Sequence, residues 1–147
     1  MPRIFNMGGP YINKWQAYAL SSLLAMALRG EKLVIAAHHP VIRSYLAVQD
    51  ILQVLTGWLM NGQAKGELTF DMSSPDTVEI GELAKRICKA TGRDIADIAR
   101  TFDPALPADR YLGDSRILLE LAQKFGIFPM GLDEQIRETR EYMRGML

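Results

Sequence analysis

The residue in this sequence that is best suited to binding an anion is a single arginine between two apolar segments. Arg43 follows the apolar run 33–37 and the turn residues His38-His39-Pro40, and it precedes the run 44–48. Short apolar runs bounded by turn residues predict strands, so we expect Arg43 at a junction between a strand and a loop. A guanidinium held there could grip a phosphate through its planar fork of donors. The alternative is an ion pair with an acid such as Asp50.

A second candidate ligand-binding side chain is Asn6, which ends a short apolar run beginning at Arg3. The residues Gly8-Gly9-Pro10 follow and predict a turn. On the residues alone, the Asn6 carboxamide either caps this turn or faces a ligand, and both readings stay open. The pair His38-His39 would suit a metal, but two adjacent histidines form no site alone and no cysteine or carboxylate cluster lies near them in sequence. We therefore expect no metal site.

Composition narrows the classes of partner. The 147 residues could bury roughly two thirds of their unfolded surface as one domain. Lys+Arg and Asp+Glu both number 17, and no basic run suits a nucleic-acid backbone. No segment approaches the roughly 18 apolar residues that cross a membrane. The lone Cys88 rules out an internal disulfide, and the amino terminus lacks a signal-peptide pattern, so we expect a cytoplasmic protein without nucleic-acid or membrane partners.

The spacing of apolar residues predicts an α/β fold with about five helices and short strands. We expect helices over 15–29, 49–61, the later part of 78–91, 115–125 and 132–144, and strands over 3–6, 33–36, 44–48 and 66–72. The segments 78–91 and 94–100 could also be taken for a helix-turn-helix unit. The zero net charge and the lack of clustered basic residues on the second segment argue against this DNA-binding interpretation.

Four motifs, in order, resemble a known family. Arg3 to Pro10 matches R-x-F-N-x-x-G-P, and Arg43 to Asp50 matches R-[SD]-[YW]-x-x-V-x-D. The segment 70–84 resembles a strand, loop and helix of the same family, and 110–115 resembles R-Y-x-x-D-[ST]. The chain thereby resembles, from end to end, the carboxyl-terminal, substrate-binding part of the extended short-chain dehydrogenase/reductase family, the NAD-dependent nucleotide-sugar epimerases and dehydratases.

The resemblance implies a binding site for a nucleotide-sugar and an incomplete nucleotide-binding sheet. Asn6 and Arg43 would hold the diphosphate, and Val34 and Ala36 would lie beside the nucleobase. The resemblance also places Gln16, where relatives often carry lysine, and Arg110, which is preceded by Pro107 rather than by a longer basic run, near the nucleotide. Residues 1–147 would be the substrate-binding region, and the amino-terminal NAD-binding Rossmann portion would be absent.

Two signatures of the family's redox chemistry are missing from the sequence. No G-x-G-x-x-G or G-x-x-G-x-x-G segment occurs, and none of the five tyrosines has a lysine four residues further on. We therefore expect no catalytic residues and no cofactor bound by this chain alone, with NAD(P) expected only for a complete enzyme. The alternative is a non-enzymatic nucleotide-sugar-binding or assembly module. Strands left with unpaired edges predict a partner, either the missing amino-terminal half or a second copy.

Overall fold

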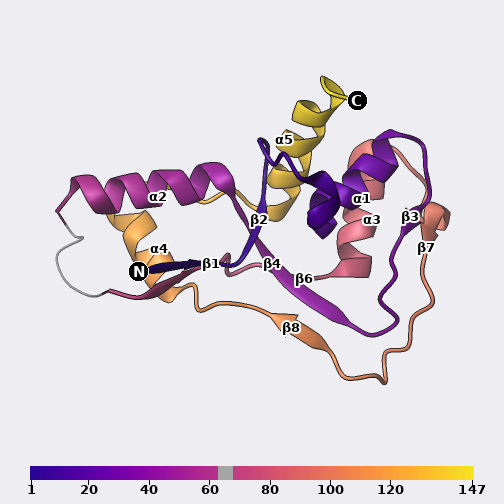
Figure 1. Cartoon of the computed structure of the whole chain (residues 1–147), viewed down its shortest axis with the longest axis horizontal. Helices are drawn as coiled ribbons and strands as arrows, with labels where there is room; N and C mark the ends of the chain where they lie inside the picture. Colours follow the sequence, from indigo (N-terminus) through magenta and orange to yellow (C-terminus); the bar gives the residue numbers. More distant parts are fainter. Residues whose placement is uncertain (63–67) are drawn as a thin grey trace.

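A seven-residue strand, β4 (Val41–Ala47), joins the two ends of the molecule in the computed structural model, which describes residues 1–62 and 68–147 (Figure 1). Three short strands pair with β4. They are β2 (Asn6–Gly8), parallel with Asn6 opposite Tyr45; β8 (Asp109–Tyr111), parallel with Tyr111 opposite Arg43; and β6 (Thr77–Glu79), antiparallel with Val78 opposite Arg43. Because β6 and β8 both pair with Ile42 and Arg43, they occupy opposite edges of β4.

Two further pairs of strands are parallel. They are β1 (Pro2–Ile4) with β5 (Phe70–Met72), and β3 (Leu33–Val34) with β7 (Ile98–Ala99). The strand predicted over 3–6 is thus two strands separated at Phe5, and only β2 joins the β4 sheet. The strand predicted over 66–72 is observed from Phe70, and its residues 66 and 67 lie outside the described part of the chain.

The described residues form five α-helices, in agreement with the sequence prediction. They are α1 (Ala19–Leu28), α2 (Val48–Met60), α3 (Ile80–Thr91), α4 (Arg116–Lys124) and α5 (Leu132–Arg144), with 3-10 turns η1 (Trp15–Ala17) and η2 (Ile95–Asp97). Residues 95–99 form η2 and a strand, so the helix-turn-helix interpretation has no second helix and is excluded.

The single helix predicted over 15–29 is wrong in its first turn. Tyr18 is extended, with φ −123°, and separates η1 from α1. The Ser21 hydroxyl donates to the carbonyl oxygens of Trp15 and Tyr18, at 2.9 and 3.2 Å. Such local bonds offer the backbone an alternative to the helical ladder, which explains the break.

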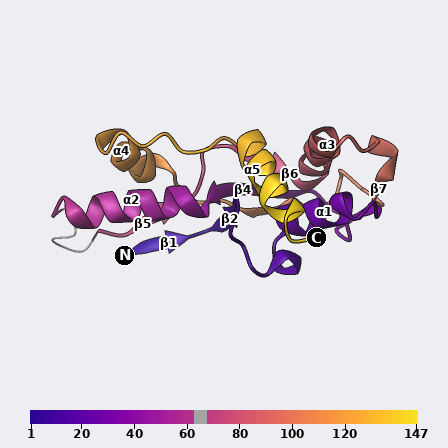
Figure 2. The same ribbon diagram turned by 90° about the horizontal axis from the view of Figure 1, so that it is seen from above.

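Two hydrophobic cores flank β4. Figure 2 shows the helices that surround them, with α2 and α4 at one end of the molecule and α1 and α3 at the other. The first core is built mainly from α1, α3 and α5, and its fully buried members include Leu20, Leu24, Leu83 and Ile87. The second core lies between α2, α4 and β5, and its fully buried members include Leu46, Val54, Met72 and Leu118. Successive residues of a strand point to opposite faces, and β4 accordingly gives Tyr45 to the first core and Leu46 to the second.

Buried polar groups join α2 and α5 to β4. The Asp50 carboxylate accepts a hydrogen bond of 2.8 Å from the Met130 amide. The Gln135 side-chain amide donates to the carbonyl oxygens of Met130 and Tyr45, at 2.8 and 3.0 Å. The bond to Met130 gives Asp50 a structural role at the start of its helix, and the bond from Gln135 to Tyr45 fixes the backbone of β4 two residues beyond Arg43.

Candidate functional site

Arg43 is the third residue of β4, not a residue at the junction of a strand and a loop as the sequence predicted. Its partner is Asp109 on β8, not Asp50. The Arg43 Nη2 atom donates to the Asp109 Oδ2 atom at 2.6 Å, and Nη1 donates to the carbonyl oxygens of Ile42 and Asp109 at 3.0 and 3.1 Å. The side chain of Arg43 is 20% exposed and that of Asp109 is 49% exposed, so the pair lies at the surface.

The electrostatics of the pair favour an ionised carboxylate. The hydrogen bond from Arg43 lowers the pKa of Asp109 below its ordinary value, and the positive potential of Arg43 and His39 adds to this. Burial raises the pKa of Tyr45 to about 12, in spite of the opposing charge of Arg43. The Tyr45 phenol therefore stays protonated at neutral pH.

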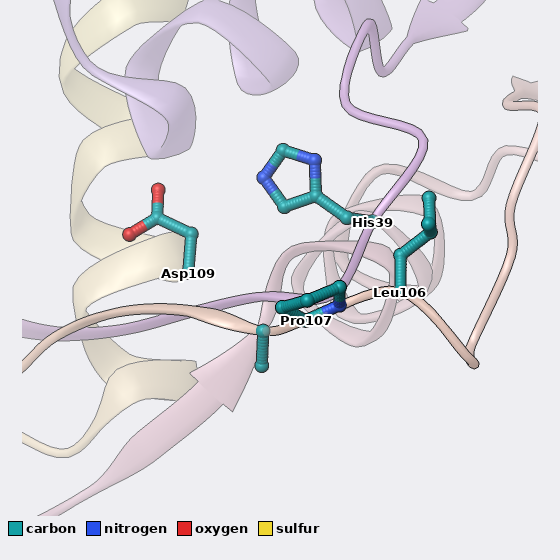
Figure 3. Close-up of a pocket in the computed structure, with 5 residues that line it drawn as sticks. His39, Leu106, Pro107 and Asp109 are labelled. Carbon is teal, nitrogen blue, oxygen red and sulfur yellow. The ribbon is translucent and has the colours of Figure 1, made fainter.

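An open hollow of about 410 Å³ lies beside this ion pair and is lined by His39, Leu106, Pro107, Ala108 and Asp109. Figure 3 shows the His39 ring turned toward the Asp109 carboxylate above Pro107. The hollow thus combines the apolar residues Leu106, Pro107 and Ala108 with two ionisable side chains. Arg43 does not line the hollow itself, but it is hydrogen-bonded to Asp109, which does.

Arg100 holds the segment that carries His39. Its guanidinium donates to the carbonyl oxygens of Ala37 and His39 at 2.9 and 2.8 Å, and to both carboxylate oxygens of Glu79 at 3.0 Å. It also lies 4.2 Å from the centre of the Phe102 ring. Arg100 is therefore a positioning residue, fixing the backbone on one wall of the hollow.

The strand β8 is held at both of its ends. The Asp109 amide donates to the Pro40 carbonyl oxygen at 2.8 Å, and the Gly113 amide donates to the Ser73 hydroxyl at 3.1 Å. A Cβ atom on Gly113 would lie 2.8 Å from Asp71, Phe5 and Ser73, so the close approach requires glycine. These contacts place the Asp109 carboxylate on Arg43.

The structure brings together only some of the site residues predicted from the sequence. Asn6 lies near the end of β8 and donates a long hydrogen bond of 3.5 Å to the Tyr111 carbonyl oxygen. Arg110 lies on β8 between Asp109 and Tyr111, and because strand residues alternate, it projects from the face opposite to Arg43. Asn6 therefore contacts β8 at Tyr111, and Arg43 contacts it at Asp109. The Arg110 side chain points away from both.

The remaining predicted residues are exposed. Val34 and Ala36 are exposed while Leu33 and Ile35 are buried, so Val34 and Ala36 share the outer face of one extended segment. Gln16 is exposed on η1. No hydrogen bond or ion pair of the described residues links these three side chains to Arg43, and none of them lines the hollow.

Asp109 and His39 are the site residues that the sequence reasoning missed. Asp109 is adjacent to the candidate Arg110, and the decisive fact is the register of β8, which sets whether residue 109 or residue 110 faces Arg43. A shift of one residue exchanges the two faces of a strand, and a three-residue strand shows no periodicity from which to read its register. His39 was considered only as a metal ligand. Within the described residues, no three His, Cys, Asp or Glu side chains gather into a group that could hold a metal ion.

The first comparisons with known proteins concern the sequence alone. No family model matches the sequence. A curated relative, UDP-glucuronic acid decarboxylase 6 of Arabidopsis thaliana, is 34% identical over 88 residues, which are 59% of this chain and 25% of that protein. The sequence similarity therefore lies in a region that makes up only a quarter of the relative.

Solved structures match nearly the whole chain. UDP-glucose 4-epimerase of Thermotoga maritima, solved with UDP-glucose, has a TM-score of 0.73 and 21% identity, over 99% of this chain and 45% of that one. dTDP-glucose 4,6-dehydratase of Bacillus anthracis, solved with NAD, has a TM-score of 0.72 and 18% identity, over 98% of this chain and 44% of that one. The chain spans less than half the length of these enzymes. The predicted α/β fold is confirmed, and the solved structures that share it are a nucleotide-sugar epimerase and a nucleotide-sugar dehydratase.

Among the described residues, no helix combines the length and the apolar character needed to cross a membrane.

Proposed function

We propose that residues 1–147 form the nucleotide-sugar-binding part of an NAD-dependent epimerase, dehydratase or decarboxylase, with Arg43 as the anchor for the diphosphate. One contact carries this proposal: the Arg43 guanidinium, beside an open hollow, already holds an anion, the Asp109 carboxylate. Carboxylates and phosphates match the same planar fork of donors. A diphosphate entering the hollow would replace Asp109 on Arg43.

The other predicted residues take secondary places in this proposal. Asn6 lies next to the end of β8, where its amide can turn from the Tyr111 carbonyl oxygen to a sugar or phosphate oxygen. The outer face formed by Val34 and Ala36 suits the flat surface of a base. Gln16 and Arg110 would contact a bound nucleotide only at its edges. Gln16 lies on η1, and Arg110 lies on the face of β8 that points away from Arg43.

The two junctions at which a strand leads directly into a helix do not fit a dinucleotide cofactor. A pyrophosphate needs free amides at a helix amino terminus. At the start of α3, the Glu79 carboxylate already accepts from the Gly81 amide at 2.7 Å, and Asp50 places a negative charge in the first turn of α2. We therefore assign to this chain only the binding of substrate, and we expect NAD(P) to be bound by another part of a complete enzyme.

The alternative function is a non-enzymatic nucleotide-sugar-binding or assembly module. The carboxylates at the two helix amino termini favour this alternative as much as they favour a divided enzyme. One measurement distinguishes the divided enzyme from the non-enzymatic module. It is the rate of hydride transfer after the NAD-binding half of a related epimerase is added to this chain. Activity supports the enzyme part, and substrate binding without activity supports the module.

The proposal also includes a second polypeptide that covers the exposed apolar face of α2. The second core leaves apolar side chains of α2 exposed, among them Leu52, Leu59 and Met60. The NAD-binding half or a second copy of the chain would cover them. We also place the protein in the cytoplasm, since its one cysteine is buried and unpaired.

The test of the diphosphate site is the substitution Arg43→Ala, followed by calorimetric titration of UDP-glucose and of inorganic pyrophosphate. Loss of the charged hydrogen bonds should weaken both by about 2 kcal/mol, or roughly thirtyfold in Kd. Arg144→Ala is the matched control, because Arg144 is also a surface arginine paired with a carboxylate, but it lies at the end of α5 and does not line the hollow. Equal affinities of the Arg43 variant and the unaltered protein would overturn the assignment.

The substitution Asp109→Asn tests whether the carboxylate competes with the ligand. Removing its charge frees Arg43, so pyrophosphate should bind about threefold to tenfold more tightly, a gain of about 1 kcal/mol. The competition would be refuted if this variant bound pyrophosphate as weakly as Arg43→Ala, since Asp109 would then be needed to position the arginine.

A further inference from the structure

The outward side of α2 carries no charged side chain. Its exposed residues are Gln49, Leu52, Gln53, Thr56, Leu59 and Met60. The one charged residue of the helix, Asp50, is buried. Among the helices of the described residues this is unusual, because α1 has no exposed residue and α3, α4 and α5 each expose Lys, Arg, Asp or Glu side chains. Charged residues are depleted at the centres of protein interfaces, so this side of α2 has the composition of a covered surface.

Four apolar residues form a stripe along this side, which we call the α2 seam. They are Val48, Leu52, Leu55 and Leu59. Leu52 and Leu59 are 59% and 61% exposed, and the other two are half-buried. The buried residues that α2 gives to the second core form a different stripe: Ile51, Val54 and Trp58. Spacings of four, three and four residues are those at which two helices pack side by side along a heptad seam.

The helix α2 lies at the outside of the molecule. In Figure 1 it runs along the upper edge of one end of the molecule, with α4 and β1 below it. Figure 2 looks down on that edge and shows α2 with no described helix or strand over it. The exposed leucines of the seam can therefore be reached by another chain.

The α2 seam matches a second copy of itself in spacing and in charge. A two-fold contact between identical chains requires a surface that is complementary to itself. The spacing of the seam reads the same in both directions. Two antiparallel α2 helices would therefore place Leu52 against the partner's Leu55, and Val48 against the partner's Leu59. Because neither outward side carries a charge, the two helices can approach without like-charge repulsion.

From this match we infer that the α2 seam is the interface of a homodimer in which the two α2 helices run antiparallel. The inference rests on the second polypeptide that the proposed function includes, and it identifies that polypeptide as another copy of this chain. A standard interface takes roughly 20 to 30 residues from each partner, and the seam is much smaller. We therefore expect a weak dimer, with a Kd of about 100 μM.

The first test is sedimentation equilibrium of the full chain without nucleotide. The average mass should rise from that of one chain toward that of two as the concentration passes through the expected Kd. Leu52→Glu should weaken the association at least about tenfold, because it places a carboxylate of each copy in the apolar seam. Leu106→Glu is the control, because it makes the same substitution at an exposed leucine outside α2. Equal weakening by both variants, or the mass of one chain at every concentration up to about ten times the expected Kd, would overturn the inference.

The second test is oxidative cross-linking of cysteine variants, which reports the orientation of the helices. Val48→Cys mixed with Leu59→Cys should give a disulfide-linked dimer. Each variant alone should not, because an antiparallel pair separates like residues by about 16 Å along the axis, beyond the roughly 7 Å that a disulfide can span between Cα atoms. The native Cys88 is fully buried and should not react. Efficient cross-linking of Leu59→Cys alone would refute the antiparallel seam.

This inference and the proposed diphosphate site can fail independently. Both tests of the seam are made without nucleotide, and Arg43 is not a residue of α2. Arg43→Ala should therefore dimerise as the unaltered chain does, whatever its affinity for UDP-glucose. Loss of the dimer in Arg43→Ala would contradict an interface formed by α2 alone.

Discussion

The two cores on either side of β4 differ in what covers their outer faces. Around the first core, the outward sides of α3 and α5 carry mainly charged side chains, many of them in ion pairs. Around the second core, large apolar side chains are exposed: Ile4, Leu52, Leu59, Met60 and Leu119. Within the described part of the chain, the second core is also backed by a two-stranded parallel sheet, β1 and β5.

From this difference we predict which end of the molecule a partner would cover. Parallel sheets are normally covered on both faces, and two strands alone have little independent stability. The first core is enclosed by three helices of its own, whereas the second relies on α2, α4 and one thin sheet. We expect the second end to be covered in the functional protein and the first to face solvent.

The largest expected effects on the free energy of unfolding come from replacing a buried leucine of each core by alanine. Leu24→Ala should destabilise the protein by about 3 to 4 kcal/mol, because α1 is surrounded and the cavity cannot collapse. Leu118→Ala removes an equally buried leucine but should cost about 2 kcal/mol, since α4 can move inward over the second core. Urea denaturation measures both costs. Equal values would mean that the two cores are equally well enclosed.

The pH dependence of stability should also differ between the two ends. Burial acts to raise the pKa of Glu79, which precedes α3, but hydrogen bonds from Arg100, Val41 and Gly81 outweigh it and leave the pKa lowered. Burial raises the pKa of Asp50, on α2; the Met130 amide opposes this and the charge of Glu134 adds to it. The two carboxyl groups therefore act on stability in opposite directions.

The sign of each contribution follows from linkage. Glu79 stabilises the fold above its unfolded pKa of about 4.3, and this contribution is lost as the pH falls through its lower folded value. Asp50 favours the fold below its unfolded pKa of about 3.9, and that contribution is lost as the pH rises through its raised folded value. Thermal melts across acid and neutral pH should show a shallower acid loss for Glu79→Gln and a higher neutral Tm for Asp50→Asn. A steeper acid loss for Glu79→Gln would contradict the assigned pKa direction.

The smallest effect on stability should come from the exposed face of α2. Leu59→Glu should change the free energy of unfolding by no more than about 0.5 kcal/mol, because Leu59 packs against neither core. It should nevertheless lower the mass measured by light scattering, if the second end of the molecule associates with another copy. Gln53→Glu, exposed on the same helix, is the control for added charge. An unchanged mass for Leu59→Glu would refute self-association through α2.

The sequence was sufficient to predict the helices, and it was insufficient to predict the arrangement of the residues around Arg43. Helix periodicity extends over three or more turns, so α2, α3 and α5 are found close to their predicted limits. The break at Tyr18 depends on the Ser21 hydroxyl bonding backward along the chain, which no apolar pattern reveals. Asp109 was missed because its meeting with Arg43 depends on the register of a three-residue strand.

The strand β4 gives consecutive residues to the two cores and carries Arg43 two residues before them. Neither core can unfold without disturbing β4. The protein should therefore unfold as a single cooperative unit, although it has two hydrophobic cores. A ligand bound at Arg43 would then raise the unfolding free energy of both cores by the same amount, according to its concentration relative to its Kd. Occupancy of the candidate site would thereby be measurable as slower hydrogen exchange in helices as distant from it as α1 and α4.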